Sequence, residues 1–390
     1  MAELRQPVWL IAEEVPPLPD GWKAMPTEEA CIQLKPGKLF ETKTVYPHGT
    51  VPVINQSAAD ILGYHNEEPG VDASHQKPVV TFANHTCAIR LMKQPFSSIQ
   101  NIFPKVGKPG VTETIYFYYA SLGRVSLSDY KGHHPIFRKA HIPVPPLPEQ
   151  KRIAGILSAY DELIENSQRR IKVLETMARN LYREWFVHYR YPGHENTSLT
   201  PSPLGHIPKG WEVKTVEGIV KRIPVGKKYD QKTVSATGTV PVFDQGKTGI
   251  IGYHDDEPGV HASESSPVVV FANHTCYQRL IQFPFSAIQN ILPFVSSPSI
   301  PRNIYWLHWA TNGLVVFNDY KGHWPEYAAK TLVVPSEEVC EQFGNFVAPM
   351  TRRILNLEKL IQNLRKTRDL LLQRLLSGQI PLQTPTTEAA

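Results

Sequence analysis

An internal repeat limits the architecture of this chain more than any other feature of its sequence. The segment that starts at Val51 (VPVINQSAADILGYHNEEPGVDAS) aligns with the segment that starts at Val240 (VPVFDQGKTGIIGYHDDEPGVHAS). VVTFANHTCAIRLMKQPFSSIQNIFP and VVVFANHTCYQRLIQFPFSAIQNILP follow at the same offset, and about 34 of roughly 56 aligned positions are identical. The match continues outward to PDGW and PKGW upstream, and to DYKGHHP and DYKGHWP downstream. Two copies of one domain are therefore expected, each of roughly 130 residues.

Each copy has the pattern of a mixed α/β domain. Short β-branched runs such as KPVVTFA and SPVVVFA alternate with Gly, Pro, Asn and His, which is typical of short strands joined by turns. A chain of 390 residues is long enough for two or three domains with separate cores. We expect the first domain at residues 1–145 and the second at residues 210–335, after a polar, Pro-rich linker at 191–209.

A heptad pattern follows each copy and predicts a long helix at residues 146–190 and another at residues 336–380. The first seam of alternating four- and three-residue spacings comprises Ile153, Leu157, Tyr160, Ile164, Ser167, Ile171, Leu174, Ala178, Leu181 and Trp185. The second, in the same register, comprises Phe343, Val347, Met350, Ile354, Leu357, Ile361, Leu364, Arg368, Leu371 and Leu375. Gly378 and Pro381 indicate the end of the second helix, before a tail at 381–390 that we expect to be disordered.

The two seams predict that the helices pair with each other. Each helix is expected to be about 55 Å long, and a seam of that length would expose many apolar side chains if it stayed unpaired. Antiparallel pairing relates the two domains by a pseudo-two-fold axis. The expected fold class is therefore α/β (α+β), with two similar mixed α/β domains separated by two long antiparallel helices that form a coiled coil.

Composition and charge exclude several classes of protein. No stretch has the 18 or more apolar residues of a membrane span, and the N-terminus MAELRQPVWLIAEE does not resemble a signal peptide, so we expect a cytoplasmic protein. The four cysteines form no C-x-x-C pair, which favours reduced thiols over disulfides or a zinc ribbon. A formal net charge of +5 permits a polyanionic partner without requiring one.

Two equivalent domains related by a two-fold axis suit duplex DNA, whose strands are antiparallel and whose grooves return every ~34 Å. The run PLPEQKRIAGILSAYDELIENSQRRIKVLETMARNLYREWF resembles the central conserved helix of specificity (S) subunits of type I restriction-modification systems. LEKLIQNLRKTRDLLLQRLLSGQIPL resembles their distal conserved helix, and the resemblance covers nearly the whole chain. The second helix departs from the pattern, because it begins SEEVCEQF in place of the E-Q signature, and its start is assigned by register alone.

The resemblance implies a function for the whole chain. In that family each target-recognition domain reads one half of a bipartite DNA target, and the helices fix the gap and dock two methyltransferase (M) subunits. The M subunits carry S-adenosylmethionine and methylate adenine at N6, and restriction (R) subunits use ATP and magnesium to cut unmodified DNA. By this resemblance the chain itself is a non-catalytic specificity subunit that holds no cofactor.

Polar residues shared by the two copies are the candidate DNA contacts. In the first copy they are Lys38, Tyr64, His65, Asn84, Arg90, Gln100, Asn101, Lys131 and His133. In the second they are Lys227, Tyr253, His254, Asn273, Arg279, Gln289, Asn290, Lys321 and His323. Arg and Lys suit phosphates, whereas Gln and Asn have the geometry to read adenine. The pairs Gln100-Asn101 and Gln289-Asn290 are the most informative, and on a strand only one residue of each pair would face a base. Residues that form turns or buried hydrogen bonds would also be identical in two copies of one fold, so a structural role is the alternative interpretation.

Positions at which the copies differ are the candidates for different half-site preferences. They are Ser57 to Asp60 against Gly246 to Gly249, with Lys247 among them, Ala88-Ile89 against Tyr277-Gln278, and Lys93-Gln94 against Gln282-Phe283. Because these differences are few, we expect a target that is nearly an inverted repeat.

Two other functions remain open at this point. The repeated His-Thr-Cys motif (His85 with Cys87, His274 with Cys276) could bind a metal if His65 or His254 supplied a third ligand, although no fourth ligand is evident. A methyltransferase N/D-P-P-aromatic motif and a P-loop are both absent from the sequence. A non-catalytic protein scaffold would also fit the mild charge.

Overall fold

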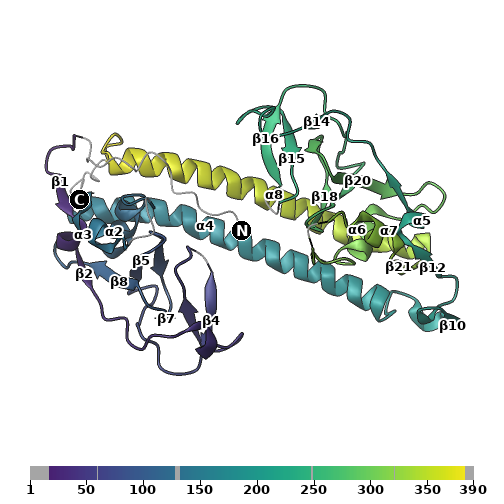
Figure 1. Cartoon of the computed structure of the whole chain (residues 1–390), viewed down its shortest axis with the longest axis horizontal. Helices are drawn as coiled ribbons and strands as arrows, with labels where there is room; N and C mark the ends of the chain where they lie inside the picture. Colours follow the sequence, from purple (N-terminus) through teal and green to yellow (C-terminus); the bar gives the residue numbers. More distant parts are fainter. Residues whose placement is uncertain (1–16, 59, 128–131, 247–248, 320, 383–390) are drawn as a thin grey trace, which may run out of the picture. The chain divides into compact units, whose positions relative to one another are not determined.

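A computed structural model describes residues 17–58, 60–127, 132–246, 249–319 and 321–382 of the chain. The chain divides into two compact units (Figure 1). The first unit combines Glu3–Ser167 with Lys359–Ala390, and the second contains Gln168–Glu358. Each unit therefore holds one α/β domain together with one segment of each long helix.

The first unit contains two sheets of different size. A four-stranded antiparallel sheet has the order β2-β8-β5-β6, and a three-stranded sheet has the order β4-β3-β7, in which β3 and β7 are parallel. β1 and β9 form a separate antiparallel pair. The strands are β1 (Lys23–Pro26), β2 (Cys31–Gln33), β3 (Val51–Ile54), β4 (Ile61–His65), β5 (Val79–Ala83), β6 (Ile89–Met92), β7 (Ser97–Ser98), β8 (Ile102–Gly107) and β9 (His141–Val144). The short helices are α1 (Thr27–Ala30), the 3₁₀ turn Thr42–Thr44, α2 (Thr114–Ser121) and α3 (His134–Lys139).

The second unit repeats this plan. Its sheets have the orders β13-β20-β17-β18 and β14-β19-β15-β16, and β12 pairs with β21. The register shift between Val53 and Ile54 of β3 recurs between Val242 and Phe243 of β15, so the sequence repeat is also a structural repeat. The strands are β12 (Glu212–Thr215), β13 (Val220–Arg222), β14 (Lys228–Tyr229), β15 (Val240–Phe243), β16 (Ile250–His254), β17 (Val268–Ala272), β18 (Gln278–Ile281), β19 (Ser286–Ile288), β20 (Ile291–Ser296) and β21 (Thr331–Val334). The short helices are α5 (Val216–Ile219), α6 (Ile304–Thr311) and α7 (Trp324–Ala329).

The segment expected to be a linker has structure of its own. After a π-helical turn at Arg183–Val187 and a 3₁₀ turn at His194–Asn196, β10 (Leu199–Ser202) and β11 (Gly205–Pro208) form a hairpin. Ile207 is buried in the core of the second unit. This segment therefore packs against the second domain, because its few apolar side chains find places in that core.

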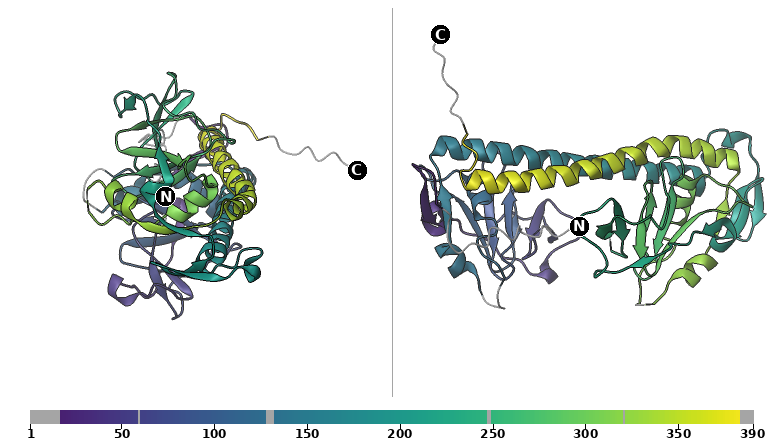
Figure 2. Two further views of the ribbon diagram at one scale, coloured as in Figure 1. Left: turned by 90° about the vertical axis from the view of Figure 1, so that its right-hand side faces the viewer. Right: turned by 90° about the horizontal axis from the view of Figure 1, so that it is seen from above.

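The two long helices are α4 (Leu147–Tyr182) and α8 (Glu337–Leu376), and every predicted seam position of both is buried or half-buried. In the first unit, Leu157 near the start of α4 shares a core with Leu375 near the end of α8. In the second unit, Ala178 near the end of α4 shares a core with Phe343 near the start of α8. The helix segments are thus antiparallel within each unit (Figure 2), and the expected fold class is confirmed.

Helix α8 ends where the sequence predicts. Gly378 has a φ of 70°, which favours glycine, and its amide donates to the Leu375 carbonyl at 3.3 Å. Of the predicted tail, residues 383–390 lie outside the described residues. No helix within the described ranges is long and apolar enough to cross a membrane. All four cysteines are free thiols, and Cys31, Cys87 and Cys340 are buried.

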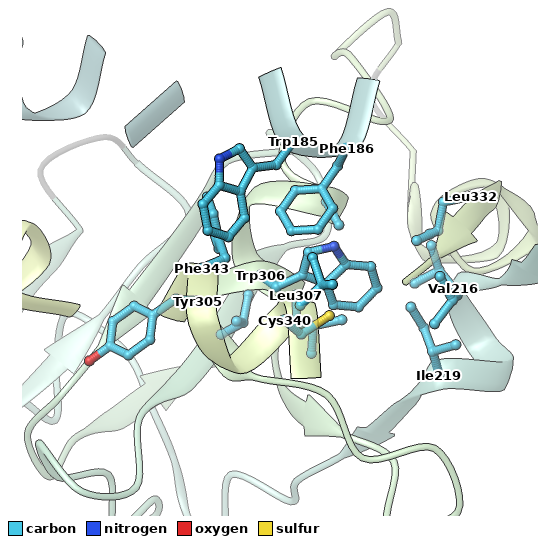
Figure 3. Close-up of a cluster of buried hydrophobic side chains, with 14 of the residues drawn as sticks. Trp185, Phe186, Val216, Ile219, Tyr305, Trp306, Leu307, Leu332, Cys340 and Phe343 are labelled. Atoms are coloured by element: carbon cyan, nitrogen blue, oxygen red, sulfur yellow. The ribbon is translucent and has the colours of Figure 1, made fainter. Parts of the chain in front are cut away.

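Aromatic side chains hold α8 against the second domain. Phe343 is fully buried, and its ring centroid lies 5.1 Å from that of Phe186 and 6.0 Å from that of Trp185 (Figure 3). Trp306 of α6 packs against Phe186 from the domain side, at 6.4 Å between centroids. One aromatic cluster therefore joins the end of α4, the start of α8 and the domain.

A buried polar network distinguishes the second core from the first. The Gln278 amide nitrogen donates to the His308 carbonyl at 2.7 Å, and the Tyr327 hydroxyl donates to the Gln278 amide oxygen at 2.8 Å. The same nitrogen lies 3.2 Å from His308 Nδ1, which accepts this bond only when the ring is neutral. Burial lowers the pKa of His308 to about 4.

We expect stability to fall as the pH is lowered from about 6.5 towards 4. Burial, with smaller contributions from Lys105 and Arg138, also lowers the pKa of His134 in the first unit to about 4. The unfolded chain therefore binds protons in this range that the folded chain does not, at a cost on the order of 1–2 kcal/mol for each histidine. Denaturant unfolding at several pH values measures the effect, and His308→Tyr, which copies Tyr118 at the equivalent position, should flatten the profile of the second unit.

Candidate nucleic-acid interface

Four loops of the first unit converge at one end of its two sheets, where β3, β5 and β7 end. The Asn84 amide donates to the Asn101 carbonyl at 3.0 Å, and the His133 amide donates to the Asn84 carbonyl at 2.9 Å. These bonds join three of the loops through their backbones. We refer to the set as the loop cluster, and its described members are residues 55–58, 84–88, 100–101 and 132–134.

Gln56 ties the fourth loop to the others. Its amide nitrogen donates to the carbonyls of Gln100 at 3.1 Å and Asn101 at 3.3 Å, and its amide oxygen accepts from the His85 amide at 3.1 Å. The Thr86 hydroxyl donates to the Gln56 carbonyl. Sequence reasoning did not select Gln56, although the available signal was its recurrence as Gln245 between a β-branched run and a variable segment.

The turn at Gln100 and Asn101 presents polar side chains from this framework. Both residues are exposed, and Asn101 has a φ of 64°, a conformation that Asn tolerates better than most residues. The expectation that the pair would alternate on a strand is wrong, because the chain reverses here between β7 and β8. No side-chain hydrogen bond joins Gln100 to another residue that the structure describes. Its amide is therefore available to a ligand while its backbone is held in place.

The second unit has an equivalent loop cluster, at residues 244–246, 273–277, 289–290 and 321–324. The Gln245 amide oxygen accepts from the His274 amide at 2.7 Å, and the Gln245 carbonyl accepts from the Thr275 hydroxyl at 2.6 Å. Gln289 is exposed and Asn290, with a φ of 68°, is half-buried. The same turn is thus presented in both units.

Asn84 and Asn273 have structural roles in these clusters. The Asn84 side-chain oxygen accepts from the His134 amide at 2.8 Å, and that of Asn273 accepts from the Trp324 amide at 2.7 Å. Each asparagine therefore fixes the start of the helix that follows, α3 or α7. Lys321 is exposed beside this point, and its carbonyl lies 2.9 Å from His274 Nδ1. Lys131, its counterpart, lies outside the described residues.

The repeated arginines brace the hairpin loops from inside. Arg90 Nε donates to the Ser57 carbonyl at 2.8 Å, and one terminal nitrogen donates to the Asp60 carbonyl at 2.8 Å. Arg279 donates to the Gly246 carbonyl at 3.2 Å, and its guanidinium lies 4.7 Å from the centre of the Tyr277 ring. These contacts indicate that the arginines position the variable loops, whereas a guanine reader would need a free guanidinium edge.

The four repeated histidines of the candidate set are buried, with 7 % exposure or less. They are His65, His133, His254 and His323. This corrects the expectation that these side chains face a ligand. His65 Nε2 lies 2.9 Å from the Ser97 hydroxyl, and its ring stacks on Phe40 at 4.1 Å. The stacking recurs between His254 and Tyr229, at 4.2 Å. Tyr64 and Tyr253 precede the β-strand histidines and are half-buried.

Lys38 and Lys227 lie in exposed ion pairs away from the loop clusters. Lys38 Nζ contacts the Glu67 carboxylate at 2.5 Å, and Lys227 Nζ contacts Asp256 at 2.7 Å. The hydrogen bond from Lys38 lowers the pKa of Glu67, and that from Lys227 lowers the pKa of Asp256. Exposed pairs of this kind contribute little to stability because water screens them, so a phosphate could replace the carboxylate.

Three of the positions that differ between the copies face inward. Gln278 is 7 % exposed and belongs to the network with His308, which corrects its assignment as a specificity residue. Lys93 is half-buried and lies 3.7 Å from Glu162 of α4, and Tyr277 is half-buried under Arg279. In the loop that Arg90 braces, Ser57 is half-buried and Asp60 is exposed, and Lys247 lies outside the described residues.

The metal-site hypothesis finds no support in this geometry. Within the described ranges, no group of three or more His, Cys, Asp and Glu side chains is arranged to hold a metal ion. Cys87 is buried, which raises its pKa to about 11, and His65 is bonded to Ser97. His85 instead contributes its backbone amide to the loop cluster.

Comparison with known proteins relates part of the chain to one family. Residues 19–176 match the family described as "Type I restriction modification DNA specificity domain". Over these residues the chain is similar to type I restriction-modification specificity subunits. Residues 19–176 cover the first domain and most of α4, and the internal repeat extends the same plan to the second domain.

Individual relatives have the same description. The chain is 24 % identical over 338 residues to the type I restriction enzyme MjaIX specificity subunit of Methanocaldococcus jannaschii, covering 76 % of this chain and 75 % of that protein. It is 28 % identical over 177 residues to the EcoR124I/EcoR124II specificity subunit of Escherichia coli, covering 37 % and 43 %. The crystal structure of the type I restriction-modification S subunit from M. genitalium has the same fold, with a TM-score of 0.59, 16 % identity, and coverage of 93 % and 97 %.

Proposed function

We propose that this chain is a specificity subunit that reads a bipartite DNA target with one half-site for each loop cluster, and that it does no covalent chemistry itself. The observation that carries the proposal is the recurrence of one exposed glutamine, Gln100 or Gln289, on the same braced turn of both units. A glutamine amide can donate to and accept from the N7/N6 edge of adenine in the major groove. A turn held through its backbone presents that amide without a large ordering cost on binding.

The remaining parts of the proposal follow the family resemblance. Exposed apolar residues on the long helices, such as Leu370 in the first unit and Met177 in the second, are proposed docking points for two methyltransferase subunits. Those subunits would supply S-adenosylmethionine and the adenine-N6 transfer, and restriction subunits would supply ATP-dependent cleavage. Because only a few surface positions differ between the loop clusters, we also propose that the two half-sites are nearly an inverted repeat.

Methylation mapping tests the proposal as a whole. Genomic DNA from cells that express this chain with its methyltransferase subunit should contain N6-methyladenine at a bipartite motif with a fixed gap. Near-inverted halves would support the repeat argument, whereas unrelated halves would show that the few differing residues control readout. Absence of any motif with an active partner would favour the alternative of a protein scaffold.

Gln100→Ala and Gln289→Ala should each weaken binding to the cognate target by about 1–3 kcal/mol and relax base preference in one half-site only. Lys321→Ala, which removes an exposed cation beside the second loop cluster, is the control for a phosphate contact: it should weaken binding uniformly across sequences and reduce the slope of log K against log salt by about 1. Fluorescence anisotropy with a set of single-base variants of the target separates the two patterns. Unchanged base preference in both glutamine variants would contradict the assignment of these turns as readers.

A further inference from the structure

A charged pair interrupts the apolar seam between the long helices in the first unit. Arg368 of α8 donates to the Asp161 carboxylate of α4 at 2.5 Å, and the Tyr119 hydroxyl of α2 donates to the other oxygen of the same carboxylate at 2.6 Å. The Arg368 side chain is 14 % exposed and that of Asp161 is 30 % exposed. Asp369 accepts further hydrogen bonds from the guanidinium at 2.8 and 3.0 Å, so Arg368 donates to carboxylates in two directions.

The second unit lacks this pair at the equivalent positions. The two seams have the same register, so Ala178 of α4 corresponds to Arg368 of α8, and Thr351 of α8 corresponds to Asp161 of α4. Ala178 is fully buried, and the Thr351 hydroxyl donates to the Val347 carbonyl of its own helix turn at 3.1 Å. Trp309 of α6 stands where α2 has Tyr119. At these equivalent positions the helix interface is therefore charged in one unit and uncharged in the other.

This asymmetry determines which of the long helices can pair without leaving a charge unpaired. The repeated seams would also allow like-with-like pairing between two copies of the chain, α4 with α4 and α8 with α8. An antiparallel α4 pair would place each Asp161 against an Ala178 of the other copy, and an α8 pair would place each Arg368 against a Thr351. Every such arrangement leaves a half-buried or buried charge without its partner on the facing helix. Pairing of α4 with α8 instead places Asp161 against Arg368 and the uncharged Ala178 against the uncharged Thr351.

We propose that the Asp161–Arg368 pair excludes like-with-like assembly of two copies, so that each α4 pairs with an α8. Between the α4–α8 arrangements that remain, the covalent connection favours the helix of the same chain through its high effective concentration. The pair thus specifies one chain with two different domains as the assembled unit, in the way that single polar seam residues specify the partner in coiled coils. The inference concerns assembly and does not rest on the proposed DNA-binding function.

Moving the arginine from one helix to the other tests the proposal on the full chain. In the double variant Ala178→Arg with Arg368→Ala, α4 carries both Asp161 and the new arginine, so two α4 helices satisfy each other. Pairing of α4 with α8 would leave both charges without partners. Light scattering after size-exclusion chromatography should give the mass of a dimer for this variant and that of a monomer for the natural chain.

A charge-reversed control keeps the pair within the chain. Asp161→Arg with Arg368→Asp should remain monomeric, because α4 and α8 still complement each other. If the arginine-transfer variant is insoluble, Asp161→Thr with Arg368→Ala makes both ends of the interface uncharged. Two differently tagged copies of that variant should co-purify several-fold more than two copies of the natural chain. A folded, monomeric arginine-transfer variant, or equal co-purification of the uncharged variant and the natural chain, would overturn the proposal.

Discussion

Phe343→Ala is expected to lower the free energy of unfolding of the second unit by about 3–5 kcal/mol, the usual cost of truncating a fully buried phenylalanine. Phe343 has no exposed surface, and the rings of Trp185 and Phe186 surround it at 6.0 and 5.1 Å. Rigid aromatic neighbours cannot collapse into the space that the ring leaves, so the cost should lie at the upper end. Denaturant unfolding followed by tryptophan fluorescence reports on this cluster through Trp185 and Trp306.

Phe346→Ala is the matched control on the same helix. Phe346 is 56 % exposed and touches Trp185 only at its edge, with 5.8 Å between ring centroids. Its truncation should cost less than about 1 kcal/mol, as is usual for surface substitutions. Equal losses for both variants would contradict the docking of α8 through the Phe343 face.

The long helices were predictable from sequence because their signal is long and periodic. Apolar residues at alternating spacings of four and three, sustained from Ile153 to Trp185, fit no structure other than a helix with one buried stripe. The sequence repeat also predicted that the two helices pair with each other, because two apolar seams of equal length can bury one another. Gly378, with its φ of 70°, marked the end of α8 through a conformation that other residues adopt only at a cost.

The details of the α/β domains could not be read in the same way. Strands such as β7 (Ser97–Ser98) and β14 (Lys228–Tyr229) are too short to show an alternating pattern, and their places depend on pairing with distant strands. The hairpin at 199–208 lies in a segment whose composition is that of a linker. Ile207 gains a buried position there only because the folded domain provides one.

The candidate site, too, could be predicted from the sequence only in part. The repeat selected residues that matter to both domains, but recurrence does not distinguish a surface contact from a buried hydrogen bond. His133 and His323 recur because each precedes a helix and is buried, whereas Gln100 and Gln289 recur on an exposed turn. Gln278 was selected because it differs from Ile89, yet the difference reflects a polar network inside the core. Exposure depends on the tertiary fold, which single-sequence patterns do not contain.

Asp161→Leu alone should lower the free energy of unfolding of the first unit by about 3 kcal/mol, because it leaves the Arg368 guanidinium at 14 % exposure with only Asp369 to neutralise it. Burial lowers the pKa of Arg368, but the charges and hydrogen bonds of Asp161 and Asp369 outweigh this effect and raise it, so the group stays cationic in the natural chain. Arg368→Leu alone should cost a similar amount, since the Asp161 carboxylate then retains only the Tyr119 hydroxyl.

The double variant Asp161→Leu with Arg368→Leu should recover most of this loss. Replacing both charges by apolar groups removes the cost of desolvating them, and such replacements are often neutral or stabilising. A double-mutant cycle by denaturant unfolding gives the coupling between the two residues, and we expect at least about 2 kcal/mol. Purely additive losses would show that the pair contributes no interaction energy across the helices. A double variant that is as stable as the natural chain, yet assembles with itself, would separate the two effects: the charges would then serve the choice of helix partner, and apolar packing would supply the stability.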